Sequence, residues 1–154
     1  NSLPTHKIYN YKPLKECLNK IIAKLHEQLF FLKITLKINS DHHDAILKAD
    51  SLKLEMAILN TLVNAIEAVP DVTGMIEVKT SVQNSRATLM ISDNGYGISA
   101  ENKDKLFEPY FTSKRNGIGL GLATTFNILK SHNAKIDVQS QLNAGTLFTV
   151  QSAE

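Results

Sequence analysis

Two asparagines stand four residues apart in an otherwise apolar run. The run reads AILNTLVNAIEAV over residues 57–69, and its amides are Asn60 and Asn64. In an α-helix, residues i and i+4 project from the same face, so both amides point the same way. They lie beside an apolar stripe formed by Leu59, Leu62, Val63 and Ile66. The pattern predicts that a polar partner faces both side chains.

Two glycine clusters indicate a second kind of chemistry. The first, DNGYG over residues 93–97, is by itself typical of a turn. The second, NGIGLGLA over residues 116–123, leads into an expected helix. Glycine lets the backbone approach a ligand closely, and a helix N-terminus offers unpaired N–H groups to phosphate. The second cluster therefore predicts a phosphate cradle, although it lacks the spacing of a P-loop and the preceding strand of a dinucleotide-binding loop.

The segment FEPYFTSKR, residues 107–115, lies between the two clusters. Its aromatic and proline residues can anchor the base of a loop, and its tip carries hydroxyl and basic donors for phosphate oxygens. A loop of about twenty residues inside a compact domain is usually functional or disordered. We interpret it as a lid over about residues 99–118 that is mobile without nucleotide; the alternative is a solvated basic loop.

These motifs need helices and strands to position them. Periodicity and breakers predict helices over about residues 13–28, 51–69 and 120–131, with Asp50 or Ser51 as the cap of the second. Alternation predicts strands over about residues 32–38, 45–49, 75–82, 86–92, 135–140 and 147–151. This order predicts an α+β two-layer sandwich with the helices on one face of the sheet.

Composition limits the class of protein. The chain has 154 residues, of which 43% are hydrophobic, and no apolar run of about 18 residues that could cross a bilayer. We expect one domain over residues 1–154, with a loose lead-in over 1–12. A net charge of +2 with scattered basic residues gives no reason to expect nucleic acid. The single cysteine, Cys17, lies in a helical apolar stripe and is expected in the core.

Taken together, the motifs resemble the N, G1, F and G2 boxes and the final Gly-Thr of sensor histidine kinase ATP-binding domains. The matching stretches are N60-x-x-x-N64-A65, D93-N-G95-x-G97, FEPYFTSK over 107–114, G117-x-G119-L-G121-L and G145-T146. The resemblance is closest in look to the nitrogen-regulation class. It implies the Bergerat fold shared with DNA gyrase, Hsp90 and MutL, a sandwich with a mixed, mainly antiparallel sheet that holds ATP beneath a mobile lid.

The resemblance also implies a role for each matching residue. Asn64 would coordinate the Mg²⁺ that bridges the ATP phosphates, because a neutral amide supplies a hard oxygen without repelling the polyphosphate. Asp93 would accept a hydrogen bond from the adenine amine. The implied catalytic residues are Asn60, Asn64 and Lys114. The remaining implied ATP contacts are Gly95, Gly97, Thr112, Arg115, Gly117, Gly119, Leu120, Gly121 and Thr146, the last acting on Asp93 through water.

Two departures from the family pattern affect the expected reaction. Glu67 stands where many relatives carry a basic residue that contacts a phosphate of ATP. We therefore expect Lys114 to make that phosphate contact instead. Asn60 stands where hydrolysing relatives carry a glutamate general base, and an amide cannot accept a proton. His26 is followed by an acid but not by the rest of a phosphoacceptor motif, and we expect it on a helix surface.

We therefore expect the cytoplasmic catalytic domain of a two-component kinase, without membrane contact of its own. The phosphoacceptor and dimerisation domain would be separate, and a response regulator would act downstream. A gyrase, Hsp90 or MutL-like ATPase module and an anti-sigma serine kinase are the alternatives, as is a degenerate module that only binds partners.

Overall fold

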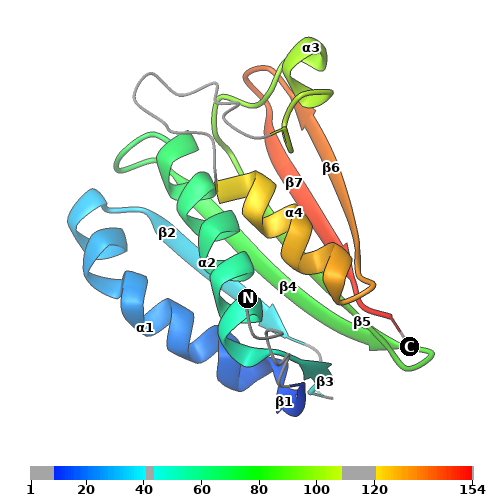
Figure 1. The fold of residues 1–154 in the computed structure, drawn as a ribbon. Coiled ribbons are helices and arrows are strands. Elements are labelled where there is room, and N and C mark those ends of the chain that lie inside the picture. The colour runs from blue at the N-terminus through cyan, green and yellow to red at the C-terminus, as the bar shows by residue number, and fades with distance from the viewer. Residues whose placement is uncertain (1–8, 41–43, 109–120, 154) are drawn as a thin grey trace, which may run out of the picture.

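The computed structural model describes residues 9–40, 44–108 and 121–153. Its centre is a five-stranded sheet in the order β2-β4-β5-β7-β6, shown in Figure 1. The strands are β2 (Thr35–Ser40), β4 (Met75–Gln83), β5 (Arg86–Asp93), β6 (Lys135–Gln141) and β7 (Gly145–Gln151). Strand β2 runs parallel to β4, and the other neighbours are antiparallel. The expected mixed, mainly antiparallel sheet is confirmed.

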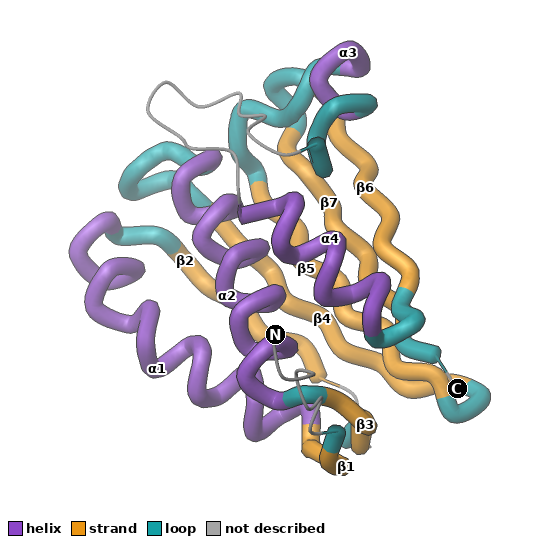
Figure 2. Tube along the Cα trace, viewed as in Figure 1, coloured by secondary structure: helices purple, strands orange, loops and turns teal. Residues whose placement is uncertain are grey.

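Three long helices cover one face of this sheet. They are α1 (Leu14–Leu32), α2 (Ser51–Ala68) and α4 (Gly121–Ser131), with α2 between the other two in both views of the chain (Figures 1 and 2). A fourth, short helix, α3 (Ala100–Lys103), lies at the end of the sheet. The α+β two-layer sandwich is confirmed, and the three long helices lie on one face as the hydrophobic periodicity predicted.

The core fills the space between the helices and the sheet. Its largest fully buried hydrophobic side chains come from α1, α2 and the neighbouring strands β4 and β5: Ile21, Leu62, Ile76, Val78 and Ile91. Burying such a side chain stabilises the fold by about 1.5–3 kcal/mol. Cys17 is part of this core, as expected, and burial raises the pKa of its thiol to about 11.

The N-terminal part of the fold differs from our expectation. Strand β1 (Asn10–Pro13) pairs antiparallel with β3 (Ile46–Ala49), so residues 10–12 are not part of a loose lead-in. Helix α1 also continues to Leu32 and ends at Lys33, which has a left-handed backbone. The predicted strand start at residue 32 was therefore too early, because the alternating pattern and the helical pattern overlap there.

The turns that fix α2 and the β4–β5 hairpin follow the predicted chemistry. Asp50 caps α2 by accepting a hydrogen bond from the backbone N–H of Lys53 at 3.3 Å. Asn84 and Ser85 both have positive φ angles between the paired residues Gln83 and Arg86, as a type I′ turn requires. Within the described ranges, we find no helix with the length and hydrophobicity needed to cross a membrane.

Candidate nucleotide site

The two amides lie in the middle helix of the layer. Asn60 and Asn64 are one turn apart on α2, and both are half-buried. Buried residues on the same helix, including Thr61 and Ala65, pack toward the core beside them. The amides therefore lie at the boundary between the packed side of α2 and its outer surface, where a bound ligand can reach them.

Helix α4 runs antiparallel to α2 and begins close to the amides. The Thr125 hydroxyl donates to the Ala57 carbonyl at 3.5 Å, and His132 just after α4 accepts from the Asp50 N–H at 3.1 Å. Seven residues separate the two contacts on each helix. One turn further along both helices, the same register places Gly121 of α4 beside Thr61 of α2. The N-terminal end of α4 is therefore next to the amide pair.

Asp93 occupies the last position of the central strand β5. Its carboxylate Oδ1 accepts a hydrogen bond from the Gly95 backbone N–H at 2.8 Å. Burial raises the pKa of Asp93, and hydrogen bonds from the backbone of Gly95 and Thr146 oppose that rise. Thr146 is also its partner residue across the β5–β7 pairing. The carboxylate is thus half-buried and fixed in position by backbone donors from both sides.

The glycines after β5 allow this loop to approach two other backbone segments. A Cβ at Gly95 would lie 2.3 Å from the carbonyl oxygen of Ala68, the last residue of α2. Gly97 has a φ of +74°, and a Cβ there would lie 2.0 Å from the Gln141 carbonyl oxygen. The expected approach of these glycines to the adenine of ATP stays a prediction. Within the fold, they let the loop pack closely against the end of α2 and against the β6–β7 turn.

Ser140 connects the loop to Thr146, and nothing in the sequence pattern pointed to it. Its hydroxyl accepts from the Ile98 N–H at 2.7 Å and donates to the Gly145 carbonyl at 3.0 Å. The Ser140 and Thr146 hydroxyls are 2.8 Å apart. Since Ser140 has one hydroxyl hydrogen, Thr146 acts as the donor of that pair. The water-mediated contact of Thr146 with Asp93 stays a prediction.

Asn94 was passed over as part of the glycine turn, although it fixes the start of the loop. Its Oδ1 accepts from the Met75 N–H at 2.8 Å and its Nδ2 donates to the Thr73 carbonyl at 3.0 Å. An asparagine directly before glycine in a turn is a signal for such side-chain to backbone bonding. The side chain thereby joins the end of β5 to the segment that leads into β4.

The structure describes the segment predicted to form a lid as far as residue 108, and the chain again from Gly121. Ser99 caps α3, and Leu106 is buried near β6 and β7. Phe107 stacks on Phe126 of α4 with ring centres 5.1 Å apart, which confirms Phe107 as an anchor. Gly121 begins α4. The expected contacts Thr112, Lys114, Arg115, Gly117, Gly119 and Leu120, and the anchors Pro109 and Phe111, lie outside the described residues.

The side chains at hand suit magnesium bound together with phosphate. Magnesium keeps several waters and takes one or two oxygens from protein when phosphates supply the rest, and the Asn60 and Asn64 amides are neutral oxygen donors. Three or more His, Cys, Asp or Glu side chains gathered as for a metal ion were not found within the described ranges. Glu67, one turn beyond Asn64, is exposed.

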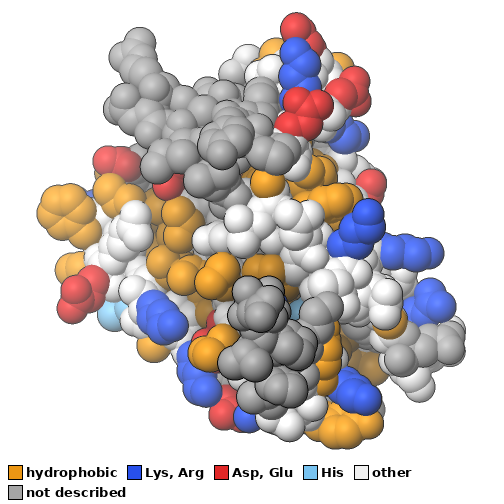
Figure 3. Space-filling view, viewed as in Figure 1, with side chains coloured by type: hydrophobic (Ala, Val, Ile, Leu, Met, Phe, Trp, Pro, Cys, Tyr) orange, Lys and Arg blue, Asp and Glu red, His pale blue; other side chains and the backbone are white. Residues whose placement is uncertain are grey.

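Charges of both signs are spread over the face that carries the helices. Figure 3 shows acidic side chains around α3 and basic side chains along the β6 side, with hydrophobic atoms exposed between the helices. The exposed basic residues there include Lys130 and Lys135. His26 is exposed on α1, as expected for a helix-surface residue.

The chain is similar to known kinases over most of its length. The family described as histidine kinase-, DNA gyrase B- and HSP90-like ATPase matches residues 49–153. Sporulation kinase B of Bacillus subtilis is 38% identical over 108 residues, 70% of this chain and 25% of that protein. Sensor histidine kinase ZraS of Escherichia coli is 33% identical over 147 residues, 96% of this chain and 31% of that protein. The chain thus spans about a third or less of these relatives.

Solved structures agree with the sequence comparison. The nucleotide-free catalytic domain of histidine kinase ThkA superposes with a TM-score of 0.86 at 26% identity, covering 94% of this chain and 95% of that one. Histidine kinase ThkA has also been solved in complex with response regulator protein TrrA, with a TM-score of 0.81 at 24% identity over 94% of this chain and 41% of that one. Membership of the nitrogen-regulation class stays a prediction. The chain belongs to the histidine kinase-, DNA gyrase B- and HSP90-like ATPase family, among the ATP-binding catalytic domains of sensor histidine kinases.

Proposed function

We propose that this domain binds Mg·ATP and transfers the γ-phosphate to a histidine on a separate helical dimerisation domain. The observation that supports it most is Asp93, a half-buried carboxylate held by backbone donors at the end of β5. It lies in a domain whose whole length is similar to a histidine kinase catalytic domain. The reaction uses ATP, and we place the domain in the cytoplasm for that reason.

Asp93 selects the base. An ionised carboxylate only accepts hydrogen bonds, and the adenine amine donates them. Guanine presents a carbonyl oxygen at the same position, and two acceptors repel. The Gly95 N–H donates to the carboxylate oxygen Oδ1 at 2.8 Å, and this hydrogen bond fixes the orientation of the carboxylate before adenine binds. Because burial raises the pKa of Asp93, adenine binding is also coupled to the ionisation of this group.

Asn60, Asn64 and the N-terminal end of α4 receive the phosphates. The register between α2 and α4 brings Gly121 next to the amide pair, where the unpaired N–H groups of the first turn favour negative charge. Asn64 would hold magnesium there, and the ion would neutralise phosphate charge. From the sequence, we also assign phosphate contacts to Lys114, Arg115 and the lid glycines.

The domain holds ATP for another acceptor instead of for water. Asn60 occupies the position of the general base of hydrolysing relatives, and its amide cannot take a proton from water. A base and an in-line nucleophile must then come from the partner, because phosphoryl transfer depends mainly on positioning and charge neutralisation. We assign the downstream partner to the response regulators, in view of the ThkA complex with TrrA.

The test separates binding from transfer. Calorimetry on this chain should show Mg·ATP binding with very slow turnover and no self-labelling. A helical hairpin that bears the motif H-E-x-x-N-P, added with [γ-32P]ATP, should acquire an acid-labile, base-stable phosphoramidate. The Asp93→Asn variant, checked for folding by circular dichroism, is the matched control and should label the hairpin far more slowly at subsaturating ATP.

Other outcomes would identify the rival functions. Rapid, steady ATP hydrolysis by the isolated chain would indicate a gyrase-like ATPase. Acid-stable label on a serine of a partner would indicate an anti-sigma kinase. Absence of ATP binding would indicate a module that only binds partners, and each of these results would overturn the proposal.

A further inference from the structure

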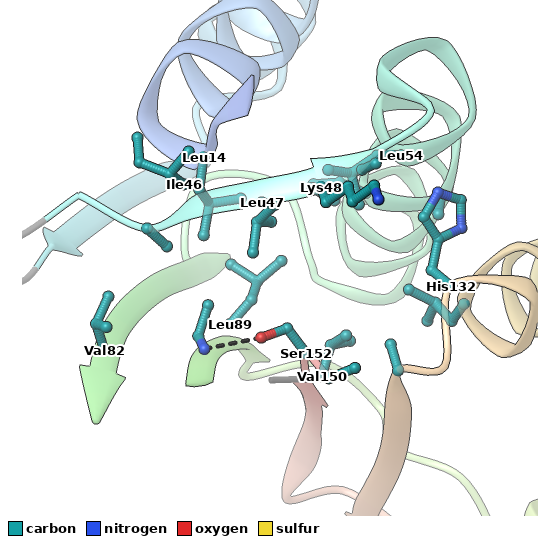
Figure 4. Close-up of a pocket in the computed structure, with 18 of the residues that line it drawn as sticks. Leu14, Ile46, Leu47, Lys48, Leu54, Val82, Leu89, His132, Val150 and Ser152 are labelled. Carbon is teal, nitrogen blue, oxygen red and sulfur yellow. Dashed lines mark hydrogen bonds between the residues drawn. The ribbon is translucent and has the colours of Figure 1, made fainter. Parts of the chain in front are cut away.

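A cavity of about 430 Å³ lies between the first half of α2 and the part of the sheet that carries Ala87, Leu89 and Val150. Figure 4 shows its walls, which come from β3, α2, β5 and β7 and from the segment that follows α4. It contacts the first half of α2, from Leu54 to Thr61, and Asn60, Asn64 and Asp93 are absent from its described lining. It is therefore distinct from the candidate nucleotide site.

The walls of the cavity are apolar and belong to regular secondary structure. The aliphatic side chains that form them include Leu47, Leu54, Ile58, Leu89, Ile91 and Val150. Protein interiors have few voids larger than a water molecule, whereas sites for small molecules have volumes of about 300–1,000 Å³. A preformed apolar hollow of this size, built from helices and strands, has the dimensions of a ligand site.

Three polar side chains on the lining are already engaged within the fold. The Thr61 hydroxyl donates to the Ala57 carbonyl at 2.9 Å. His132 uses both ring nitrogens, Nε2 as the acceptor from Asp50 and Nδ1 as the donor to the Ile128 carbonyl at 2.8 Å. Asp44, a carboxylate on the lining, accepts from the Lys15 N–H at 3.1 Å. These groups complete the architecture of the cavity and are not needed to hold a ligand.

Ser152 and Lys48 offer donors on the lining, as do the hydroxyls of Tyr11 and Ser85. Ser152 Oγ accepts from the Ala87 N–H at 2.9 Å, drawn as the dashed line in Figure 4, and its own hydrogen has no acceptor among the described residues. Lys48 lies on β3, and its ammonium makes no ion pair within the part of the chain that the structure describes. The cavity thus combines an apolar interior with hydroxyl donors and with the ammonium of Lys48, an exposed residue on its lining.

We propose that this cavity binds a small amphiphilic carboxylate, of the class of medium-chain fatty acids. The hydrocarbon chain lies among the aliphatic residues of α2, β5 and β7, where it removes apolar surface from water. The carboxylate accepts a charge-assisted hydrogen bond from Lys48 Nζ. This site is independent of the proposed phosphotransfer, because none of its residues takes part in holding ATP.

Decanoate, used below its micellar concentration, is the probe. Calorimetry on the whole chain should show saturable binding of one decanoate per chain, and methyl resonances of Leu47, Leu89 and Val150 should shift with the same saturation. Lys48→Met removes the ammonium and keeps most of the side-chain stem, and should weaken decanoate binding about tenfold or more while leaving decanol binding unchanged. Lys53→Met, an exposed lysine on α2 outside the lining, is the matched control and should bind decanoate like the parent.

Competition and filling decide where the probe binds. ADP should leave decanoate affinity unchanged if the two sites are distinct, so displacement of decanoate by ADP would overturn the proposal. Ala87→Leu should abolish decanoate binding by filling the cavity, and its fold is checked by circular dichroism. Absence of decanoate binding by the parent chain, for example because another part of the protein fills the cavity, would also overturn the proposal. Equal decanoate affinities of Lys48→Met and the parent would overturn it as well.

Discussion

Asp93→Asn should lower the affinity for ATP about tenfold to a hundredfold while the fold is retained. The variant keeps an oxygen that can accept from the Gly95 N–H, as Oδ1 does at 2.8 Å in the parent. Its other substituent becomes an NH₂ donor that faces the adenine amine, so the charge-assisted hydrogen bond is lost. Such a bond contributes about 1.5–3 kcal/mol, and about 1.4 kcal/mol corresponds to a factor of ten in affinity.

The same substitution should not lower the stability of the domain at neutral pH. Burial raises the pKa of Asp93 above its ordinary value of 3.8, so the native state holds this proton more tightly than the unfolded chain does. The free energy of unfolding of the parent therefore falls as the pH rises from that ordinary value through the raised pKa. Asparagine does not ionise, and the variant lacks this loss. Its relative stability should be greatest at neutral pH and should shrink in acid.

Calorimetric titration with Mg·ATP measures the change in ATP affinity, and urea unfolding at several pH values measures the change in the free energy of unfolding. In the parent, ATP affinity should also fall as the pH drops through the raised pKa, because the protonated acid has lost the negative charge that strengthens its hydrogen bond with the adenine amine. The variant should not show this decline. Equal ATP affinities of parent and variant would refute the adenine role of Asp93, and a variant that unfolds at neutral pH would refute the stability argument.

Three further substitutions or reactions test other parts of the structure. Asn64→Ala should remove the gain in ATP affinity that magnesium produces, whereas Asn64→Asp should keep part of it, because an oxygen ligand survives; titrations with and without magnesium decide this. Gly97→Ala should lower the free energy of unfolding by more than about 1 kcal/mol in urea, since a Cβ would lie 2.0 Å from the Gln141 carbonyl oxygen at a φ of +74°. Cys17 should react with a thiol reagent at pH 8 far more slowly in the native than in the unfolded chain, because its pKa is raised to about 11 and it is buried; similar rates would show that α1 opens readily.

Much of the fold was readable because its elements carry strong, local signals. The apolar stripes of α1 and α2, the Asp50 cap and the β4–β5 hairpin each depend on residues close together in sequence, and all were confirmed. Strand β1 was missed because four residues, two of them Lys12 and Pro13, form no clear alternation. Its partner strand β3 is more than thirty residues away in sequence, so the pairing depends on tertiary context.

The site was predictable where a residue type has few uses, and not where it has many. A carboxylate followed by two glycines is by itself typical of a turn, and only its order with the paired amides and the later glycines led to the prediction of Asp93, Asn60 and Asn64 as site residues. Ser140 carries no such signal, since a serine in a strand is common, and its contacts with Ile98 and Thr146 arise only when three segments meet. Residue type alone cannot report such a meeting.

The pairing of Asp93 with Thr146 has a consequence for how the domain folds. The two residues lie 53 positions apart, so the carboxylate reaches its final surroundings only after β7, the last strand that the structure describes, has joined β5. Contacts between residues so distant in sequence form late and slow the approach to the native state. ATP can then act only on the finished domain. We expect Mg·ATP to slow unfolding in stopped-flow experiments and to leave the refolding rate unchanged; faster refolding with ATP would mean that the adenine end assembles earlier.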